Sequence, residues 1–492
     1  MLPISGPKTW SASLARGASG DFPAAQFEIL ASIILLILGW VFVPFYIRSG
    51  VFTMPEFLER RYNSWARGYL SWVSILAYVL TKISVTIVAG GIVFTTLLGI
   101  DFWTGAILIV VSTGLYTVLG GLRAVIYTDM IQMFVLIGGS VAMTVFGLAE
   151  LGGWNEMVAR TEPLYLNLWR PMSDAEFPWT GIIFGAPILG IWYWCTDQFI
   201  VQRVLAARNI TEARKGAIFA GFLKLLPLFI FLIPGVIAYA LSQGPDAIIE
   251  FPLDQDGQPE YDAALPALVL GILPAGLKGL VIAGLLAALM SSLSSVFNSC
   301  STLFTIDIYK KYFPQSSETS LVRVGQIATI VLVVFGLIWI PVMQAMNDGG
   351  LFQYLQSVQA YISPPIAAVF LLGIFSRCLN AYGAMAALIT GFGLGILRLA
   401  LEASGVTTTG SALLDLYINS NFLHFAIFLF LVCSAVLVFA SLSSPPQPLD
   451  QIKDLTWSIS EYRREGAIVK PGLVVLSVLL LLCIAGLWLW FS

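Results

Sequence analysis

Hydrophobic residues along this chain gather in long runs that contain no charged side chain. Residues 279–306 and 349–376 each form an uncharged run of 28 residues, and residues 416–449 form one of 34. A run of 18 or more such residues is long enough to cross the hydrocarbon core of a bilayer as a helix. The pattern therefore predicts an all-α polytopic membrane protein.

The uncharged runs and the residues that break them predict about twelve transmembrane helices. We expect them at 24–46, 68–98, 103–120, 125–149, 178–198, 212–242, 265–308, 322–345, 350–375, 380–401, 420–443 and 470–491. The run 265–308 is long for one crossing and predicts a tilted or extended helix. Gly185, Pro187 and Gly190 predict a broken helix in the fifth span. Residues 1–23 form a polar N-terminal segment.

The positive charges between the spans predict the orientation of the chain. If the N-terminus lies outside and the spans alternate, 17 Lys and Arg residues fall on the inner side and six on the outer side. Cytoplasmic loops carry an excess of Lys and Arg. We therefore expect a multi-pass protein of the plasma membrane with both termini outside.

The composition narrows the class of protein further. Hydrophobic residues make up 58% of the 492 residues and charged residues 11%, against about 25% charged in an ordinary soluble domain. This excludes a soluble enzyme, a nucleic-acid binder and a disordered chain. The sequence holds no phosphate-binding loop motif, so ATP-driven pumping has no support. Its single histidine and five scattered cysteines predict no metal cluster and no cofactor.

Four ionisable residues within or at the ends of the spans are candidates for function, because charge inside a bilayer is costly. Lys224 lies deep in the sixth span, where it either serves a site or snorkels towards the surface. Glu28 and Asp129 each begin a span, where a carboxylate is also favoured by the helix dipole. Asp197 ends the fifth span, as a gate, a salt-bridge partner or a plain terminal charge.

Neutral polar residues add a second group of candidates. Ser291, Ser292 and Ser295 follow Ala288 in the middle of a span, and Ser291 and Ser295 share one helix face. Such hydroxyls either replace part of a Na⁺ hydration shell or simply allow close helix packing. Gln356 offers two donors and an acceptor to a polyhydroxylated ligand, or to a neighbouring helix. Together, these candidate residues suit a binding site for a polar neutral solute and a small cation.

Several long segments of this chain resemble the sodium–solute symporter family, in particular its sodium/glucose cotransporter branch. The matching segments are Gly50–Arg61, Gly120–Asp129, Leu189–Gln198, Val201–Arg203, Phe222–Pro227, Ser291–Tyr309 and Pro364–Leu372. The resemblance implies a LeuT-type fold of two inverted repeats, here 24–149 and 178–375, followed by C-terminal helices at 380–491. It implies a sodium-coupled symporter that imports a sugar such as glucose or galactose by alternating access.

The resemblance also implies roles for particular residues. Glu28, Lys224 and Gln356 would bind sugar hydroxyls, and Tyr193 would stack on the sugar ring. Tyr193, Trp194 and Asp197 would form a gate on the inner side. Ala288, Ser291 and Ser292 would bind the coupling Na⁺, and Ser295 with Asp129 would form a second Na⁺ site. Gly190 stands where relatives often supply a polar side chain to the sugar.

The start of the chain departs from the family pattern. Members of the family carry two further helices before residue 24, and residues 1–20 do not resemble them, so the first two helices are expected to be missing. Two alternatives therefore stay open beside sugar import. The solute is inositol or another polyol, or the chain does not transport and acts as a sensor or binding partner.

Overall fold

The computed structural model describes residues 7–51, 53–243, 247–253, 257–345, 350–452, 455–457 and 470–492. Within its helices it leaves the side chains of residues 7–12, 116, 118–131, 133, 344–345, 350 and 449–450 undescribed. The regular elements of these described residues are helices, joined by turns and two isolated β-bridges. The prediction of an all-α protein is confirmed.

The first half of the chain contains seven main helical units, several of which include a short π-helical or 3-10 stretch. They are α1 (Pro7–Ala18), η1 to α3 (Phe22–Ser49), α4 (Met54–Arg61), α5 to α6 (Ser64–Leu98), α7 (Phe102–Leu151), η4 to η5 (Gly181–Thr196), and α11 to α12 (Ile210–Ser242), with the short helices α8 (Trp154–Ala159) and α10 (Gln198–Leu205) between them.

The second half of the chain combines long helices with several short ones. They are η7 (Tyr261–Ala263), α13 (Ala264–Ile272), α14 (Ala275–Thr302), η8 (Leu303–Tyr309), α15 (Lys310–Tyr312), α16 (Glu318–Ala345), α17 (Gly350–Phe375), α18 (Ala381–Ala403), α19 (Ala412–Asn419), α20 (Phe422–Leu442), α21 (Leu449–Ile452) and α23 (Pro471–Trp490).

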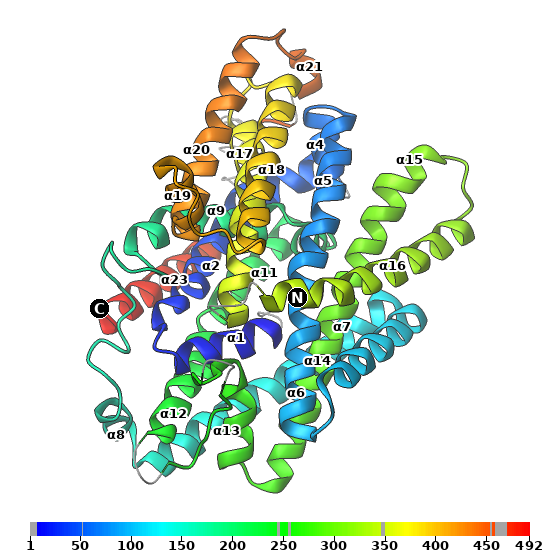
Figure 1. Ribbon diagram of the computed structural model, residues 1–492. Coiled ribbons are helices and arrows are strands. Elements are labelled where there is room, and N and C mark those ends of the chain that lie inside the picture. The colour runs from blue at the N-terminus through cyan, green and yellow to red at the C-terminus, as the bar shows by residue number, and fades with distance from the viewer. Residues whose placement is uncertain are drawn as a thin grey trace.

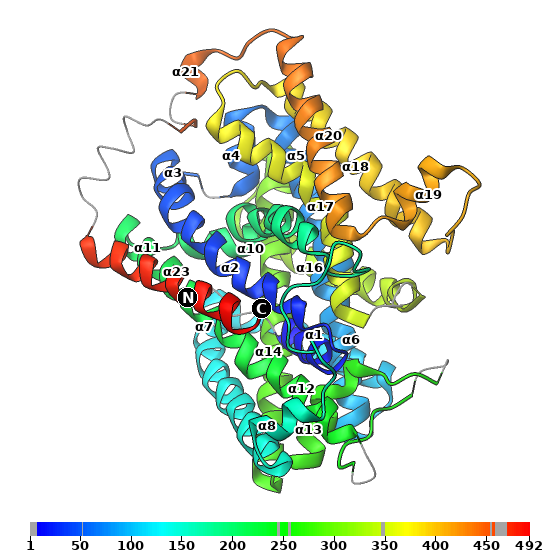
Figure 2. The same cartoon turned by 90° about the vertical axis from the view of Figure 1, so that its left-hand side faces the viewer.

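Two groups of helices flank a central region that holds the site. Helices α17, α18 and α20 pack on one another in one group, and α7 packs against α6, α12 and α14 in the other (Figures 1 and 2). The unit α5 to α6 runs past both groups (Figure 1). Helix α2 lies between them and contacts α9 and α11. Segments that are far apart in sequence therefore meet around α2.

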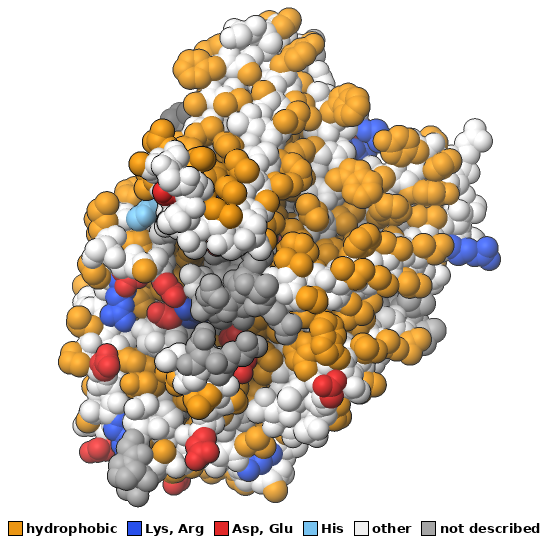
Figure 3. All heavy atoms as spheres, in the orientation of Figure 1, with side chains coloured by type: hydrophobic (Ala, Val, Ile, Leu, Met, Phe, Trp, Pro, Cys, Tyr) orange, Lys and Arg blue, Asp and Glu red, His pale blue; other side chains and the backbone are white. Residues whose placement is uncertain are grey.

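Ten helices of the described residues are long and apolar enough to cross a membrane. They match ten of the predicted spans in position, allowing for shifted ends, and Gly181–Thr196 is a shorter apolar helix at the predicted fifth span. Hydrophobic side chains cover much of the face shown in Figure 3, and most of its charged side chains lie in the lower left part. A surface that faces lipid has to be apolar in this way.

The predicted seventh span, 265–308, is wrong as a single tilted helix. Helix α13 ends at Ile272, and a new helix, α14, begins at Ala275 after Pro274. Pro274 has extended backbone at the N-cap position, where its missing N–H costs no helical hydrogen bond. Hydropathy alone did not mark this turn, because both sides of it are apolar.

The region of the predicted third and fourth spans is one helical segment, α7, of 50 residues. The predicted interruption near residues 120–125 therefore does not appear as a loop. The apolar pieces Phe102–Leu115 and Phe134–Leu151 at its two ends correspond to the two predicted spans.

The N-terminal segment is a packed helix rather than a polar tail. Leu14 and Ala18 of α1 are fully buried, and α1 packs against α12 and η6. Gly17 and Gly235 allow this approach, because a Cβ atom on either would meet the backbone of the other helix at 2.1 Å. The division into two repeats and a C-terminal group stays a prediction.

Two helix interruptions place candidate residues in the centre of the molecule. The break predicted at Gly185, Pro187 and Gly190 is wrong, because η4, α9 and η5 form one apolar helix from Gly181 to Thr196, with Pro187 in the first turn of α9. The interruption comes after this helix, at Asp197, where the backbone is extended and the Asp197 carboxylate caps α10 by accepting from Phe199 N. Helix α11 ends at Leu223 because Pro227 has no N–H to bond the Leu223 carbonyl. Lys224 lies at that end.

Candidate functional site

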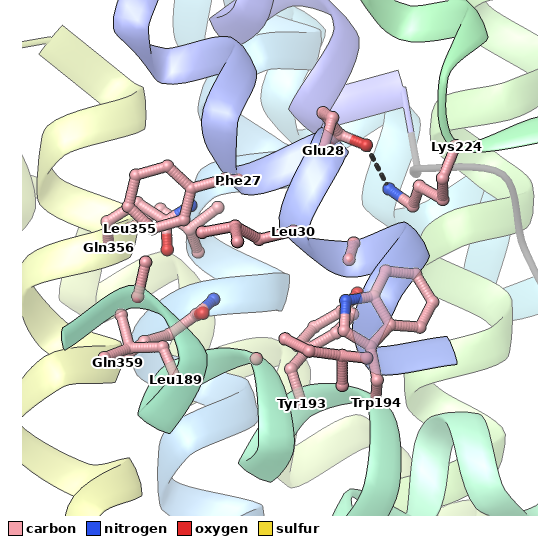
Figure 4. A pocket seen from close by; sticks show the side chains of 14 residues that line it. Phe27, Glu28, Leu30, Leu189, Tyr193, Trp194, Lys224, Leu355, Gln356 and Gln359 are labelled. Atoms are coloured by element: carbon pink, nitrogen blue, oxygen red, sulfur yellow. Dashed lines mark hydrogen bonds and ion pairs between the residues drawn. The ribbon is translucent and has the colours of Figure 1, made fainter. Parts of the chain in front are cut away.

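A central pocket gathers five of the predicted site residues. It encloses about 660 Å³ that no protein atom fills, including space that opens to solvent. Its walls come from α2, α9, η5, the end of α11, and α17. The predicted residues that line it are Glu28, Tyr193, Trp194, Lys224 and Gln356 (Figure 4).

Glu28 and Lys224 form an ion pair at one side of the pocket (Figure 4). Glu28 lies in the first turn of α2, where the helix dipole favours a carboxylate. Both side chains are buried, at 6% and 4% exposure. The Lys224 ammonium also lies 4.8 Å from the centre of the Trp194 ring, within reach of a cation–π interaction. The pair thus offers charged hydrogen-bonding groups inside a sheltered space.

Tyr193 and Trp194 contribute aromatic surface to the pocket beside this pair. Their ring centres lie 5.0 Å apart, with the rings nearly perpendicular. The segment is held from behind, because the buried Tyr46 hydroxyl donates a hydrogen bond of 2.8 Å to the Cys195 carbonyl. A flat ring with an apolar face, such as that of a sugar, fits against aromatic side chains of this kind.

Two amides line the opposite side of the pocket. Gln356 and Gln359 lie three residues apart on α17, so they share one face of the helix. Figure 4 shows both side chains across the pocket from the Glu28–Lys224 pair. The wall contributed by α9, which is Ala186, Leu189 and Gly190, carries no hydrogen-bonding side chain.

Asp197 does not line the pocket but belongs to a second buried cluster. It pairs with Lys82 of η3 and accepts a hydrogen bond from the Tyr78 hydroxyl. The Lys82 ammonium lies 4.9 Å from the centre of the Tyr193 ring. The cluster therefore connects η3 to the break before α10 and contacts one wall of the pocket.

A third charged group lies beyond Phe27, on another side of the pocket. The Phe27 ring, which lines the pocket, contacts the rings of Phe177 and Phe352 at 6.3 and 5.7 Å. The Arg16 guanidinium lies over both of these rings. It donates to the carboxylate of Glu176 at 2.6 Å, and it also pairs with Asp21. These aromatic and charged residues cover the pocket on that side.

The predicted Na⁺ ligands lie on α14 and do not line the pocket. Ala288, Ser291 and Ser295 are buried, and Ser292 is half-buried. The Ser295 hydroxyl accepts a hydrogen bond of 3.3 Å from Arg203. Asp129 lies in α7, which packs on α14, but its side chain lies outside the described residues. The second predicted Na⁺ site is therefore described only in part.

The pocket lies among membrane-length helices, next to the interruptions at Lys224 and Asp197, and carries a buried ion pair and two amides. Transporters commonly place their substrate sites at such helix interruptions. The residues 15–391 match the model of the sodium:solute symporter family. The chain belongs to the sodium:solute symporter family, and it is not an enzyme.

Comparisons with individual proteins place the chain in the sodium/glucose cotransporter branch. It is 38% identical to mouse sodium/glucose cotransporter 4 over 90% of this chain and 68% of the relative. It is 38% identical to rabbit sodium/glucose cotransporter 1, over 93% and 73%. It is 40% identical to bovine sodium/mannose cotransporter SLC5A10, over 88% and 77%. The protein is thus a sodium-coupled solute symporter of this branch.

Solved structures confirm the predicted fold. A Na⁺-coupled sialic acid symporter in a substrate-bound outward-open state superimposes with a TM-score of 0.73 at 22% identity, over 90% of this chain and 88% of that one. The inward-facing structure of the transporter Mhp1 gives a TM-score of 0.50 at 13% identity, over 93% and 96%. These likenesses show the LeuT-type transporter fold.

The sequence reasoning missed three residues that the structure brings to the site. Lys82 was visible as a charge within a span, but nothing in the sequence paired it with Asp197. Gln359 was visible only as an amide near Gln356. Arg16 lies in a segment interpreted as a polar tail, and no pattern in the sequence pointed to its contacts with Glu176 and Phe352.

Proposed function

We propose that this protein imports a sugar, of the glucose, galactose or mannose class, together with Na⁺. The observation that carries the proposal is the pocket in which a buried ion pair faces two amides, with the Tyr193 and Trp194 rings beside the pair. Sugar hydroxyls are both donors and acceptors, so the charged pair and the amides can bind several of them at once. The names of the relatives support the same class of substrate.

In this proposal Glu28, Lys224 and Gln356 bind hydroxyls, and Tyr193 stacks on the ring. Trp194 holds the Lys224 ammonium in place. The cluster of Asp197 with Lys82 and Tyr78 gates the inner side, because it ties the break before α10 to η3. A sugar that displaces part of the Glu28–Lys224 pair replaces one charged hydrogen bond with others, which keeps both charges satisfied.

We further propose that Na⁺ binds at Ala288, Ser291 and Ser292, with a second ion at Ser295 and Asp129. Hard cations prefer oxygen ligands, and α14 supplies hydroxyl oxygens in a buried setting. Coupling requires that Na⁺ and sugar each bind more tightly to the state that the other favours. The excess of Lys and Arg on one side of the spans supports a plasma-membrane protein with both termini outside.

The proposal is tested with the purified protein in liposomes. Uptake of labelled glucose is measured with an inward gradient of NaCl and, separately, of choline chloride. We expect sodium-dependent accumulation that unlabelled galactose or mannose inhibits. Inhibition by inositol alone would identify a polyol as the solute instead. Equal uptake in sodium and choline would overturn sodium coupling, and no uptake in either would overturn transport by this chain.

A further inference from the structure

Two polar side chains join helix α10 to the serine row of α14. The Gln202 amide donates a hydrogen bond of 3.0 Å to the Ser299 hydroxyl. The Arg203 guanidinium donates one of 3.3 Å to the hydroxyl of Ser295, which is buried. A positive charge of the protein therefore contacts the same hydroxyl that the proposed function assigns to the second Na⁺.

The guanidinium of Arg203 is held in this place by its own helix. Its Nη1 atom donates to the Phe199 carbonyl at 2.8 Å, and its central carbon lies 4.7 Å from the centre of the Phe199 ring. A guanidinium stacks well on an aromatic face. The backbone N–H of Phe199 in turn donates to the Asp197 carboxylate that caps α10. The position of the Arg203 charge is therefore tied to the position of α10 and to the interruption at Asp197.

A Na⁺ ion on Ser295 and the guanidinium in this position would be very close together. A hard cation of this size lies about 2.5 Å from its oxygen ligand. The Arg203 Nη2 atom is 3.3 Å from the same oxygen. Two positive charges held to one buried oxygen repel each other strongly, because little water lies between them to screen the charge. Asp129 is not described at its side chain, so the conflict follows from Ser295 alone.

We propose that Arg203 is a tethered cation that takes the place of the second Na⁺ at Ser295, so that the guanidinium and the ion exclude one another. The inference rests on the proposed function, because it concerns the second of the two proposed Na⁺ sites. The second ion binds only when α10 has moved the guanidinium away. When the ion leaves, the guanidinium returns to Ser295, supplies the hydroxyl with a donor and opposes rebinding of the ion.

A purely structural role would have Arg203 tie α10 to α14 without any effect of its charge. The neighbouring Gln202 separates the two roles, because it makes the same kind of tie with no charge. Arg208 is an exposed arginine just beyond the end of α10, so Arg208→Gln removes one positive charge near the site without removing a contact to α14. Gln202→Ala and Arg208→Gln are therefore matched controls.

The test measures equilibrium binding of ²²Na⁺ to the purified protein without sugar, which gives the number of bound ions and their affinities. Arg203→Gln removes the charge but keeps a donor, and we expect it to bind the second Na⁺ about tenfold more tightly than the wild type, a modest share of such a repulsion. Arg203→Lys, Gln202→Ala and Arg208→Gln should stay close to the wild type. Ser295→Ala should remove the second ion and, with it, the effect of Arg203→Gln.

The outcomes separate this inference from the proposed function. If the wild type binds no Na⁺ and shows no sodium-driven uptake, both fall. If Na⁺ binds and drives uptake but Arg203→Gln binds the second ion no more tightly than the wild type, only the inference falls. An equal gain in Gln202→Ala, or a gain in Arg203→Gln that survives Ser295→Ala, would also overturn it. If Arg203→Gln does not fold, Arg203→Met decides by the same comparison: tighter binding of the second ion supports the inference, and unchanged binding contradicts it. If neither neutral variant folds, Arg203→Lys decides through its double variant with Ser295→Ala: two bound ions in that double variant would contradict the inference, and one would support it.

Discussion

Two buried lysine–carboxylate pairs lie close together in this molecule but in different surroundings. Lys224 and Glu28 line the pocket, whereas Lys82 and Asp197 lie in packed protein, where the Lys82 ammonium is within 4.5 Å of the centres of the Tyr78 and Phe199 rings. Each pair joins segments more than a hundred residues apart in the chain. Both are lysine–carboxylate pairs, but Asp197 also accepts from the Tyr78 hydroxyl and from Phe199 N, and only the first pair borders the pocket.

This difference separates a binding role from a structural one. A ligand that enters the pocket can offer hydroxyls to Glu28 and Lys224, so their charges stay satisfied when the pair opens. Lys82 and Asp197 have no such space, and separating them exposes uncompensated charge to an apolar interior. The first pair is therefore suited to bind, and the second to hold η3 and α10 together until the protein changes conformation.

The largest expected effect comes from breaking the enclosed pair. Asp197→Leu leaves the Lys82 ammonium without its carboxylate and removes the cap of α10, so we expect a loss of about 3–5 kcal/mol in stability. Thermal unfolding of the detergent-solubilised protein, followed by size-exclusion chromatography, measures this loss. The double variant Lys82→Met with Asp197→Leu should recover much of it. A single variant as stable as the wild type would contradict the structural role.

Breaking the pair that lines the pocket should affect substrate affinity more than folding. Lys224→Met removes a charged hydrogen-bond donor, and we expect the KM for sugar uptake to rise by about 10- to 100-fold. Expression and elution volume should stay near those of the wild type, because the remaining Glu28 carboxylate borders the pocket. If Lys224→Met unfolds as readily as Asp197→Leu, the contrast between the two pairs is wrong.

The uncharged serines of α14 extend the comparison to a site without an ion pair. Ser292→Ala removes one proposed Na⁺ ligand, and we expect the sodium concentration for half-maximal uptake to rise several-fold, about 1 kcal/mol of binding. Ser299→Ala is the control, because the Ser299 hydroxyl donates to the Ser295 carbonyl in the same helix. Equal sodium dependence in all three proteins would leave the serines with a packing role alone.

The smallest effect on stability is expected at Glu176, which pairs with Arg16 beside the pocket. Burial raises the pKa of the Glu176 carboxyl above its ordinary value of 4.5, although the Arg16 guanidinium opposes this. The folded state then binds the proton more tightly than the unfolded state does, so this group contributes most to stability at low pH. That contribution is lost as the pH rises from the ordinary value through the raised one.

Melting temperatures measured across this pH range test the expectation, with Glu176→Gln as the comparison. The melting temperature of the wild type relative to that of Glu176→Gln should fall as the pH rises from the ordinary pKa of the carboxyl through its raised value. A difference that stays constant across the range would show that Glu176 keeps an ordinary pKa.

The sequence predicted most of the spans, because membrane insertion requires long apolar runs. Such runs can be recognised in the sequence without knowing what each helix packs against. It also selected Glu28 and Lys224, since a charge within an apolar run stands out. It could not show that α1 packs, because the burial of Leu14 depends on Gly235, more than two hundred residues away. The turn at Pro274 was hidden for a different reason, since both flanking helices are apolar.

The sequence could not show which residues of the site pair with one another. Lys82 and Lys224 look alike in the sequence, each a lone lysine among apolar residues. Their different roles follow from the space beside them, which is set by contacts with η5, α2 and α17.

The most direct test of the account measures sugar binding to the purified protein in sodium and in choline. Tritiated glucose binding is titrated for the wild type, for Lys224→Met and for the control Gln353→Met, whose side chain lies on α17 but does not line the pocket. We predict that sodium strengthens binding to the wild type and to Gln353→Met, and that Lys224→Met binds weakly in both salts. Binding that is as tight in Lys224→Met as in the wild type, or that is indifferent to sodium, would contradict a sodium-coupled sugar site at this pocket.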